Sequence, residues 1–192
     1  MTPRTRPKRF HVLEREQFVP TSIDATYGFF ADARNLEVIT PPWLSFQVLT
    51  EGEIPMAVGT TIDYRIRMLG VPMRWRSLIS RWEPGVAFVD EQFEGPYRWW
   101  HHTHTFEAHE GGTILRDRVE YAVPGGALAP LVHAAFVRRR LREIFDFRRD
   151  AIAKIFVADS TTLVFPTDLP RTSVPPARPT APRSSGTARR CA

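Results

Sequence analysis

The hydrophobic positions change their period along the chain, and each change indicates a different kind of element. The stretch "RFHVLEREQFVP" is typical of a first strand that ends at its proline. In the residues that follow, Ile23, Tyr27 and Phe30 recur at the spacing of one helix face. Thr21 or Ser22 would cap this helix, because a side-chain oxygen there accepts from a free backbone N–H.

The next residues predict a second short helix and then a series of strands. The helix is expected to begin at Asn35 and to stop before Pro41-Pro42. The strand-like segments, separated by Gly- and Pro-containing turns, are 44–51, 59–69, 72–82, 86–93, 97–108 and 113–123. A last helical period runs from about Pro130 to Phe156. A helix pair, an antiparallel meander and a long terminal helix predict an α+β fold.

The hairpin formed by 59–69 and 72–82 has an apolar face. A tight turn at Gly70-Val71 would place Met68 opposite Met73, and residues opposite each other share a face. The face that this register buries holds Ile62, Tyr64, Ile66, Met68, Met73 and Trp75.

The other face of the same hairpin is basic. The register pairs Arg67 with Arg74 and Arg65 with Arg76, and like charges directly opposite cost up to roughly 1 kcal/mol. Neutralisation by nearby acids is the simpler interpretation, and an anionic docking site is the alternative. The acids available are Asp63, Glu91 and Glu94.

The stretch "FEGPYRWWHHTHTF", residues 93–106, concentrates histidines and aromatic residues. Strand alternation places on one face Trp100, His102, His104 and Phe106. Asp90 shares a face of the preceding strand with Phe88 and Gln92, and a reversal at residues 94–96 would bring Asp90 opposite His102.

A second hairpin, at Gly111-Gly112, would extend this row of polar groups. It would place Phe106 opposite Asp117 and His102 opposite Tyr121. Because the face with the aromatic side chains is the more apolar one, we assign it to the interior. Its histidines and aspartates then need hydrogen-bond partners or water.

Three interpretations of the row remain open. His102 and His104 could chelate a metal with Asp90 or Asp117 as third ligand, although this spacing is weakly specific. An Asp–His pair could orient an imidazole for general acid–base catalysis. The preferred interpretation is the polar lining of a mainly apolar cavity, or an internal network. Neither a metal nor a cofactor is expected.

The terminal helix places an arginine in its apolar stripe. The stripe consists of Ala134, Val137, Leu141, Ile144, Phe145, Ile152, Ile155 and Phe156. Arg148 lies in its middle, and a buried arginine needs a carboxylate partner. Asp90 and Asp117 are the inward acids of the sheet; otherwise Arg148 extends outward to solvent.

Charge and composition divide the chain into three parts: a basic extension over 1–9, a domain over 10–157 and a disordered tail over 158–192. The net charge of +5 belongs to the two ends, which indicates solvated tails rather than specific binding to nucleic acid. The tail is rich in proline and lacks an apolar period. Its Cys191 is the single cysteine. No run reaches the length of a membrane span, so a cytoplasmic protein is expected.

Four stretches together resemble a known superfamily: "NLEVITPPWLSFQV", "GTTIDYRIRMLGVPMRWRSLI", "FVDEQFEGPYRWWHHTHTF" and "LREIFDFRR". Over about residues 10–157 the chain is similar to the START-like helix-grip fold of the SRPBCC superfamily, in its bacterial polyketide cyclase/dehydrase-like, ligand-binding branch. The resemblance implies a curved antiparallel sheet that grips the long C-terminal helix around a deep cavity. Such cavities bind lipids, polyketides, hormones or aromatic metabolites, and only some members are enzymes.

The leading hypothesis is therefore a protein that binds a small hydrophobic or aromatic molecule. The expected ligand contacts are Tyr64, Trp75, Asp90, Gln92, Trp100, His102, His104, Asp117, Tyr121 and Arg148. The alternative is a cyclase or dehydratase that acts on a polyketide-like substrate. Its histidines would exchange protons, its aspartates would orient them, and Arg148 would polarise a carbonyl or enolate. A third possibility is an interaction module that uses the arginine face. Catalysis, the ligand and the oligomeric state stay open.

Overall fold

The computed structural model describes residues 5–68, 70–126 and 129–159. They form one compact unit within Met1–Thr162, while the unit Leu163–Ala192 lies outside the described residues. The predicted tail lies outside them too, apart from its first two residues, which belong to the last helix. None of the described helices is long and apolar enough to cross a membrane.

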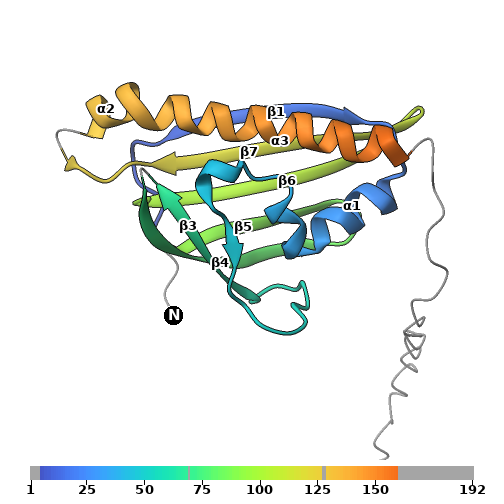
Figure 1. Ribbon diagram of the computed structural model, residues 1–192, viewed down its shortest axis with the longest axis horizontal. Helices are drawn as coiled ribbons and strands as arrows, with labels where there is room; N and C mark the ends of the chain where they lie inside the picture. The colour runs from blue at the N-terminus through green and yellow to red at the C-terminus, as the bar shows by residue number, and fades with distance from the viewer. Residues whose placement is uncertain (1–4, 69, 127–128, 160–192) are drawn as a thin grey trace, which may run out of the picture. The chain divides into compact units, whose positions relative to one another are not determined.

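A seven-stranded, curved antiparallel sheet forms the largest part of the domain (Figure 1). Its spatial order is β1-β7-β6-β5-β4-β3-β2, so the first and the last strand lie side by side. The strands are β1 (His11–Val19), β2 (Gln47–Val48), β3 (Thr61–Met68), β4 (Val71–Glu83), β5 (Ala87–Glu94), β6 (Trp99–His109) and β7 (Gly112–Ala122). The predicted strands are all present, although β2 is much shorter than its hydrophobic segment.

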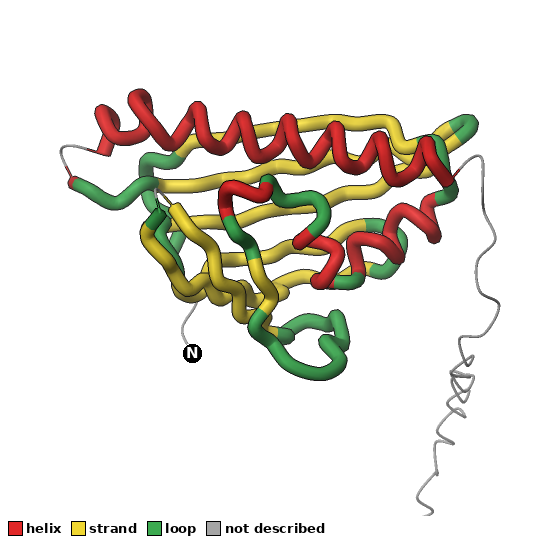
Figure 2. The backbone as a smooth tube through the Cα atoms, viewed as in Figure 1, coloured by secondary structure: helices red, strands yellow, loops and turns green. Residues whose placement is uncertain are grey.

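The helices lie before and after the strands of the meander. They are α1 (Ile23–Ala31), the 3-10 helices η1 (Ala33–Glu37) and η2 (Pro42–Leu44), α2 (Ala129–Val132), the π-helical turn η4 (His133–Val137) and α3 (Arg138–Asp159). In Figure 2 the long terminal helix runs alongside the strands, with α1 near its C-terminal end. Together with the sheet, this arrangement confirms the predicted α+β fold with a long C-terminal helix.

Side-chain caps set where the first two helices begin. The hydroxyl of Ser22 accepts a hydrogen bond from the backbone N–H of Ala25, as predicted. The second helix begins at Ala33 rather than Asn35. The reason is that the Asp32 carboxylate accepts from the N–H of Arg34 and so starts a tighter, 3-10 turn.

The register between β3 and β4 differs from the prediction by two residues. Met68 lies opposite Val71 rather than Met73, and every pair along the hairpin moves accordingly. Side chains alternate with a period of two, so a shift of two leaves the same face inward. On the other face Arg65 lies opposite Arg74, while Arg76 donates to both carboxylate oxygens of Asp63, at 2.7 and 2.9 Å.

The β6–β7 hairpin differs by two residues as well. His104 lies opposite Asp117, whereas the prediction placed Phe106 there, and His102 lies opposite Val119 rather than Tyr121. The predicted pairing of Asp90 with His102 across β5 and β6 is confirmed. The shift therefore brings Asp117 next to the histidines.

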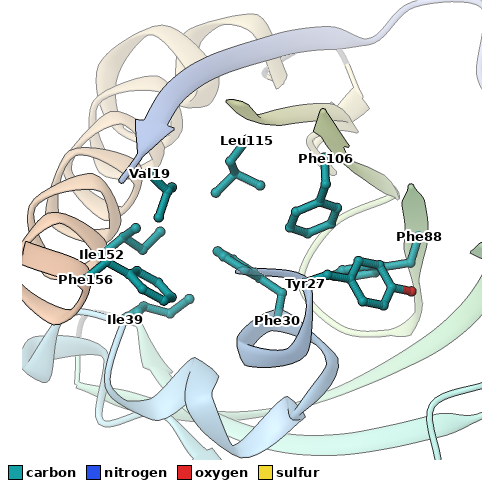
Figure 3. Close-up of a cluster of buried hydrophobic side chains, with 9 residues drawn as sticks. All are labelled: Val19, Tyr27, Phe30, Ile39, Phe88, Phe106, Leu115, Ile152 and Phe156. Carbon is teal, nitrogen blue, oxygen red and sulfur yellow. The ribbon is translucent and has the colours of Figure 1, made fainter. Parts of the chain in front are cut away.

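Buried aromatic and aliphatic side chains join the helices to the sheet. Figure 3 shows one such cluster, in which side chains from α1, α3 and several strands converge: Val19, Tyr27, Phe30, Ile39, Phe88, Phe106, Leu115, Ile152 and Phe156. A second cluster packs the beginning of α3 against β6 and β7, and a third covers β3 and β4. The cavity described next is bordered by members of all three clusters.

Candidate functional site

A cavity of about 140 Å³ lies between the sheet and α3. Most of its lining is apolar and aromatic, including Tyr64, Trp75, Phe88, Tyr97, Trp100 and Phe145. The ionisable groups in the lining, apart from the tyrosines, are Asp90, His102, His104 and Arg148. An apolar chamber with a few polar groups at one wall is the usual form of a small-molecule site.

Seven of the ten expected ligand contacts line this cavity. They are Tyr64, Trp75, Asp90, Trp100, His102, His104 and Arg148. The other three, Gln92, Asp117 and Tyr121, are buried but are not part of the lining. The strand pattern correctly placed their side chains on the inward face, but it could not show that other side chains separate them from the cavity.

Gln92 has a structural partner instead. Its side-chain amide donates to the carbonyl of Tyr97 at 2.7 Å, and its Oε1 accepts from the Tyr97 N–H at 3.1 Å. Gln92 therefore holds the connection between β5 and β6. Tyr121 contacts the terminal helix region, where its hydroxyl lies 2.8 Å from Nε2 of His133.

Several lining residues were not predicted. Tyr97 is the first residue of the predicted strand 97–108, in which alternation would place it on the face opposite to Trp100; in the structure it lies before β6 begins and lines the cavity. Phe145 belongs to the predicted apolar stripe of α3 and lies one turn before Arg148, so the helical period contained the necessary signal. Leu44 and Phe46 belong to the predicted strand 44–51, whose inward face was not assigned; in the structure Leu44 ends η2 and β2 begins only at Gln47.

Two buried histidines, the buried Asp117 and the half-buried Asp90 form a cluster at one wall of the cavity. Nε2 of His102 lies 2.8 Å from Oδ1 of Asp117, and Nε2 of His104 lies 3.0 Å from Oδ2 of Asp90, both with hydrogen-bond geometry. The Nδ1 atoms are close to the opposite carboxylates: 3.3 Å from His102 to Asp90 and 2.9 Å from His104 to Asp117. We call these four residues the His–Asp cluster.

The strand register builds the His–Asp cluster. Asp90 comes from β5, both histidines from β6 and Asp117 from β7, three neighbouring strands whose side chains face the same way. The two imidazole centroids are 3.8 Å apart. Because all four side chains stand on paired strands, the geometry is fixed by backbone hydrogen bonds rather than by a loop.

The surroundings of the cluster favour its charged carboxylates. Burial raises the pKa of Asp90 and Asp117, but the two histidines outweigh this, so both pKa values lie below the usual aspartate range. Burial lowers the pKa of His102, but the charges and hydrogen bonds of the two aspartates outweigh it and raise that pKa. The buried Asp117 and the half-buried Asp90 thus stay ionised next to imidazoles that line the cavity.

Arg148 is buried beside this cluster with part of its hydrogen-bonding capacity unused. Its Nη1 lies 3.7 Å from Oδ1 of Asp117, which is an ion pair but too long for a hydrogen bond. Within the described residues, its Nε and Nη1 atoms donate to no acceptor. The guanidinium also lies 4.9 Å from the ring centre of Phe145. The predicted link between Arg148 and an inward aspartate therefore exists, with Asp117, but leaves donors free.

The sequence profile of one family covers most of the domain. The family is described as "Polyketide cyclase / dehydrase and lipid transport", and its profile matches residues 19–146. A comparison with curated proteins finds no significant match.

Solved structures share the fold at low sequence identity. TTHA0849 from Thermus thermophilus is 17% identical with a TM-score of 0.59, covering 78% of this chain and 99% of its own. The Zhui aromatase/cyclase from Streptomyces sp. R1128 is 15% identical with a TM-score of 0.63, covering 79% and 96%. Major latex-like protein 151 from Panax ginseng is 12% identical with a TM-score of 0.55, covering 77% and 97%. At such identities the likeness establishes the fold.

Proposed function

Because the chain belongs to the polyketide cyclase / dehydrase and lipid transport family, we propose that its cavity binds a small hydrophobic or aromatic molecule that carries a hydrogen-bond acceptor. The apolar lining provides the favourable free energy of burying such a molecule. The acceptor, a carboxylate or a carbonyl oxygen, distinguishes the ligand from a purely apolar one.

One observation carries this proposal: the buried guanidinium of Arg148 lines an apolar cavity with donors to spare. A buried N–H without an acceptor costs about 1–3 kcal/mol, more for a charged group. A ligand oxygen that accepts from one of these donors would remove this cost, and a charged guanidinium is suited to a carboxylate. Arg148 would thus orient the ligand while aromatic side chains enclose it.

The size of the cavity limits the ligand. An engineered apolar cavity of roughly 150 Å³ accepts benzene, and the cavity here measures about 140 Å³. A ligand with a single aromatic ring therefore fits the described conformation. A larger polycyclic ligand would require the lining to move.

Binding of matched ligands to two arginine variants tests the proposal. Benzoate and its uncharged relative toluene are titrated into the protein, with heat release and tryptophan fluorescence as readouts, since Trp75 and Trp100 line the cavity. We expect Arg148→Met to weaken benzoate binding about tenfold to a hundredfold, as the loss of a charged hydrogen bond predicts, and to leave toluene binding unchanged. Arg149→Met is the control, since Arg149 is exposed and pairs with Asp150.

Two results would contradict the proposal. The first is that neither compound binds while native mass spectrometry of freshly purified protein also finds no co-purified small molecule. The second is that benzoate and toluene bind equally well to the wild type and to Arg148→Met. Circular dichroism and thermal melting establish that each variant is folded before binding is measured.

A second candidate function is general acid–base catalysis on a polyketide-like substrate. It is favoured by the hydrogen bond between Asp117 and His102, which orients an imidazole that borders the cavity. Here a cyclase or dehydratase would use a histidine to exchange a proton with the substrate. The test is conversion of a short poly-β-ketone analogue, followed by mass spectrometry. Loss of conversion without loss of binding in His102→Gln would support catalysis.

A further inference from the structure

Two imidazoles and one carboxylate at the cavity wall hold their donor atoms close together. One donor atom each from Asp90, His102 and His104 lies within 4.8 Å of the other two. We propose that these three side chains form a binding site for a divalent transition-metal ion, with one coordination position open to the cavity. The site goes beyond the small-molecule binding proposed above and does not depend on it.

The distances suit a metal with short bonds. Oδ2 of Asp90 lies 3.3 Å from Nδ1 of His102 and 3.0 Å from Nε2 of His104. Ligand atoms at about 2.0–2.2 Å from a tetrahedral zinc lie roughly 3.3 Å from one another. All three donor atoms lie within 4.8 Å of one another, so an ion could occupy the space among them after small movements of the side chains. The sequence already placed Asp90 opposite His102 and left a metal as one interpretation, although none was expected; the structure adds the short distance from Asp90 to His104.

Asp117 supplies the outer partner that metal-binding histidines usually have. It accepts a hydrogen bond from Nε2 of His102 at 2.8 Å, and its Oδ1 is 2.9 Å from Nδ1 of His104. With its proton on Nε2, His102 turns the lone pair of its Nδ1 toward Asp90. Nε2 of His104 has hydrogen-bond geometry with Asp90, while its Nδ1 has no hydrogen-bond partner among the described residues, so a metal at Nε2 would replace the hydrogen bond to Asp90. A carboxylate that accepts the other ring N–H fixes the tautomer and makes the ligand more basic. Asp117 is thus a positioning residue.

The charge of the cluster also favours a cation. Once a metal has replaced the imidazole protons, the two carboxylates and the guanidinium of Arg148 sum to a formal charge of −1; Asp117 and Arg148 are buried and Asp90 is half-buried. A buried excess charge is costly unless it is compensated. A divalent ion would compensate it, and the ion pair of Arg148 is with Asp117 rather than with the proposed ligand Asp90.

The donor set and the exposure of the site define the kind of metal. Two imidazole nitrogens and one carboxylate oxygen suit Zn²⁺, Co²⁺ or Fe²⁺ better than Mg²⁺ or Ca²⁺, which prefer oxygen alone. Asp90, His102 and His104 line the cavity, whereas Asp117 does not. Three protein ligands with a free position are typical of zinc sites that also contact a water or a small molecule.

Cobalt titration of chelator-treated, full-length protein tests the site with the metal alone. We expect one equivalent of Co²⁺ to produce the visible absorption bands of a four- or five-coordinate ion with nitrogen and oxygen ligands. Zn²⁺ should displace it and raise the melting temperature. His104→Ala should abolish the bands, and Asp117→Asn should weaken binding about tenfold to a hundredfold, as loss of an outer carboxylate does.

Two matched histidine variants control for other sites. His101 lies on the same strand but points to the opposite face, near Glu91, and His133 stacks on His11. We expect His101→Ala and His133→Ala to bind Co²⁺ like the wild type. Failure of folded wild-type apoprotein to bind Co²⁺ or Zn²⁺ in a saturable manner would overturn the proposal. So would stoichiometric binding that survives His104→Ala and disappears in His133→Ala. The wild-type spectrum decides the matter if a variant fails to fold.

Discussion

At the scale of single residues, Gln92 shows how an inward polar side chain can serve the backbone. It is 3% exposed, and its amide makes two hydrogen bonds with the main chain of Tyr97. These bonds hold the turn that leads into β6, the strand of the two histidines. Gln92 therefore acts on the cavity indirectly, through the position of Tyr97.

Gln92→Ala should destabilise the domain by about 2–4 kcal/mol. The substitution removes the two buried hydrogen bonds that Gln92 makes with the carbonyl and the N–H of Tyr97, and each lost bond costs about 1–2 kcal/mol. Urea unfolding measures the change. Gln47→Ala is the control, because the Gln47 side chain is exposed and accepts a hydrogen bond from the surface Arg65. Equal stability of the two variants would contradict this role.

At the scale of elements, the glycines Gly28 and Gly112 differ in the space available for a side chain. Gly28 lies in α1, and a Cβ built there meets no atom within 4 Å. Gly112 begins β7, where a Cβ would lie 2.3 Å from the carbonyl oxygen of Val19 and 2.7 Å from the ring of Phe18. The close approach of β1 to the start of β7 thus depends on a missing side chain.

Gly28→Ala and Gly112→Ala should shift stability in opposite directions. Alanine in an exposed helical position reduces the freedom of the unfolded chain and stabilises by about 0.4–1 kcal/mol. At Gly112 the clash includes backbone, which cannot rotate away, so a loss of about 1–3 kcal/mol or more is expected. Denaturant melts of both variants provide the measurement. A neutral Gly112→Ala would show that β1 and β7 separate easily.

The elements also show what the sequence could predict. Alternation identified the buried faces of the strands and the inward histidines, because a face depends only on the parity of a position. Alternation could not determine which residues pair across two strands. Both hairpins are shifted by two residues from the prediction, and a shift of two leaves every side chain on the same face. Asp117 was therefore expected next to Phe106, and the compact His–Asp cluster followed only from the structure. The free donors of Arg148 depend on the side-chain conformation of this residue, which a helical period does not predict.

At the scale of the whole molecule, the burial of the tyrosine side chains should make the stability of the fold depend on pH in the alkaline range. The chain has four tyrosines, Tyr27, Tyr64, Tyr97 and Tyr121. Burial raises the pKa of all four, that of Tyr27 to about 12. A phenol whose pKa is raised in the folded state contributes stability that is complete below its unfolded value, about 10, and is lost as the pH rises through the folded value.

We therefore expect the free energy of unfolding to fall steadily above pH ~10. Phenolate absorbance should appear together with the loss of the folded circular dichroism spectrum, rather than before it. Parallel absorbance and dichroism titrations measure both. Ionisation of one or more tyrosines near pH ~10 with the fold intact would show that their burial is less complete than described.

The pairing of β1 with β7 affects the order in which the sheet folds during synthesis. Register partners such as His11 and Tyr121, or Val19 and Thr113, are about a hundred residues apart in the chain. A growing chain can form the hairpins of β3 to β6 from neighbouring segments, but β1 must wait for β7 to leave the ribosome. Pairings between distant segments form slowly, because a large loop has to close first. Asp117 arrives on that same late strand, so the histidines of β6 remain without one of their two carboxylates until the sheet is finished.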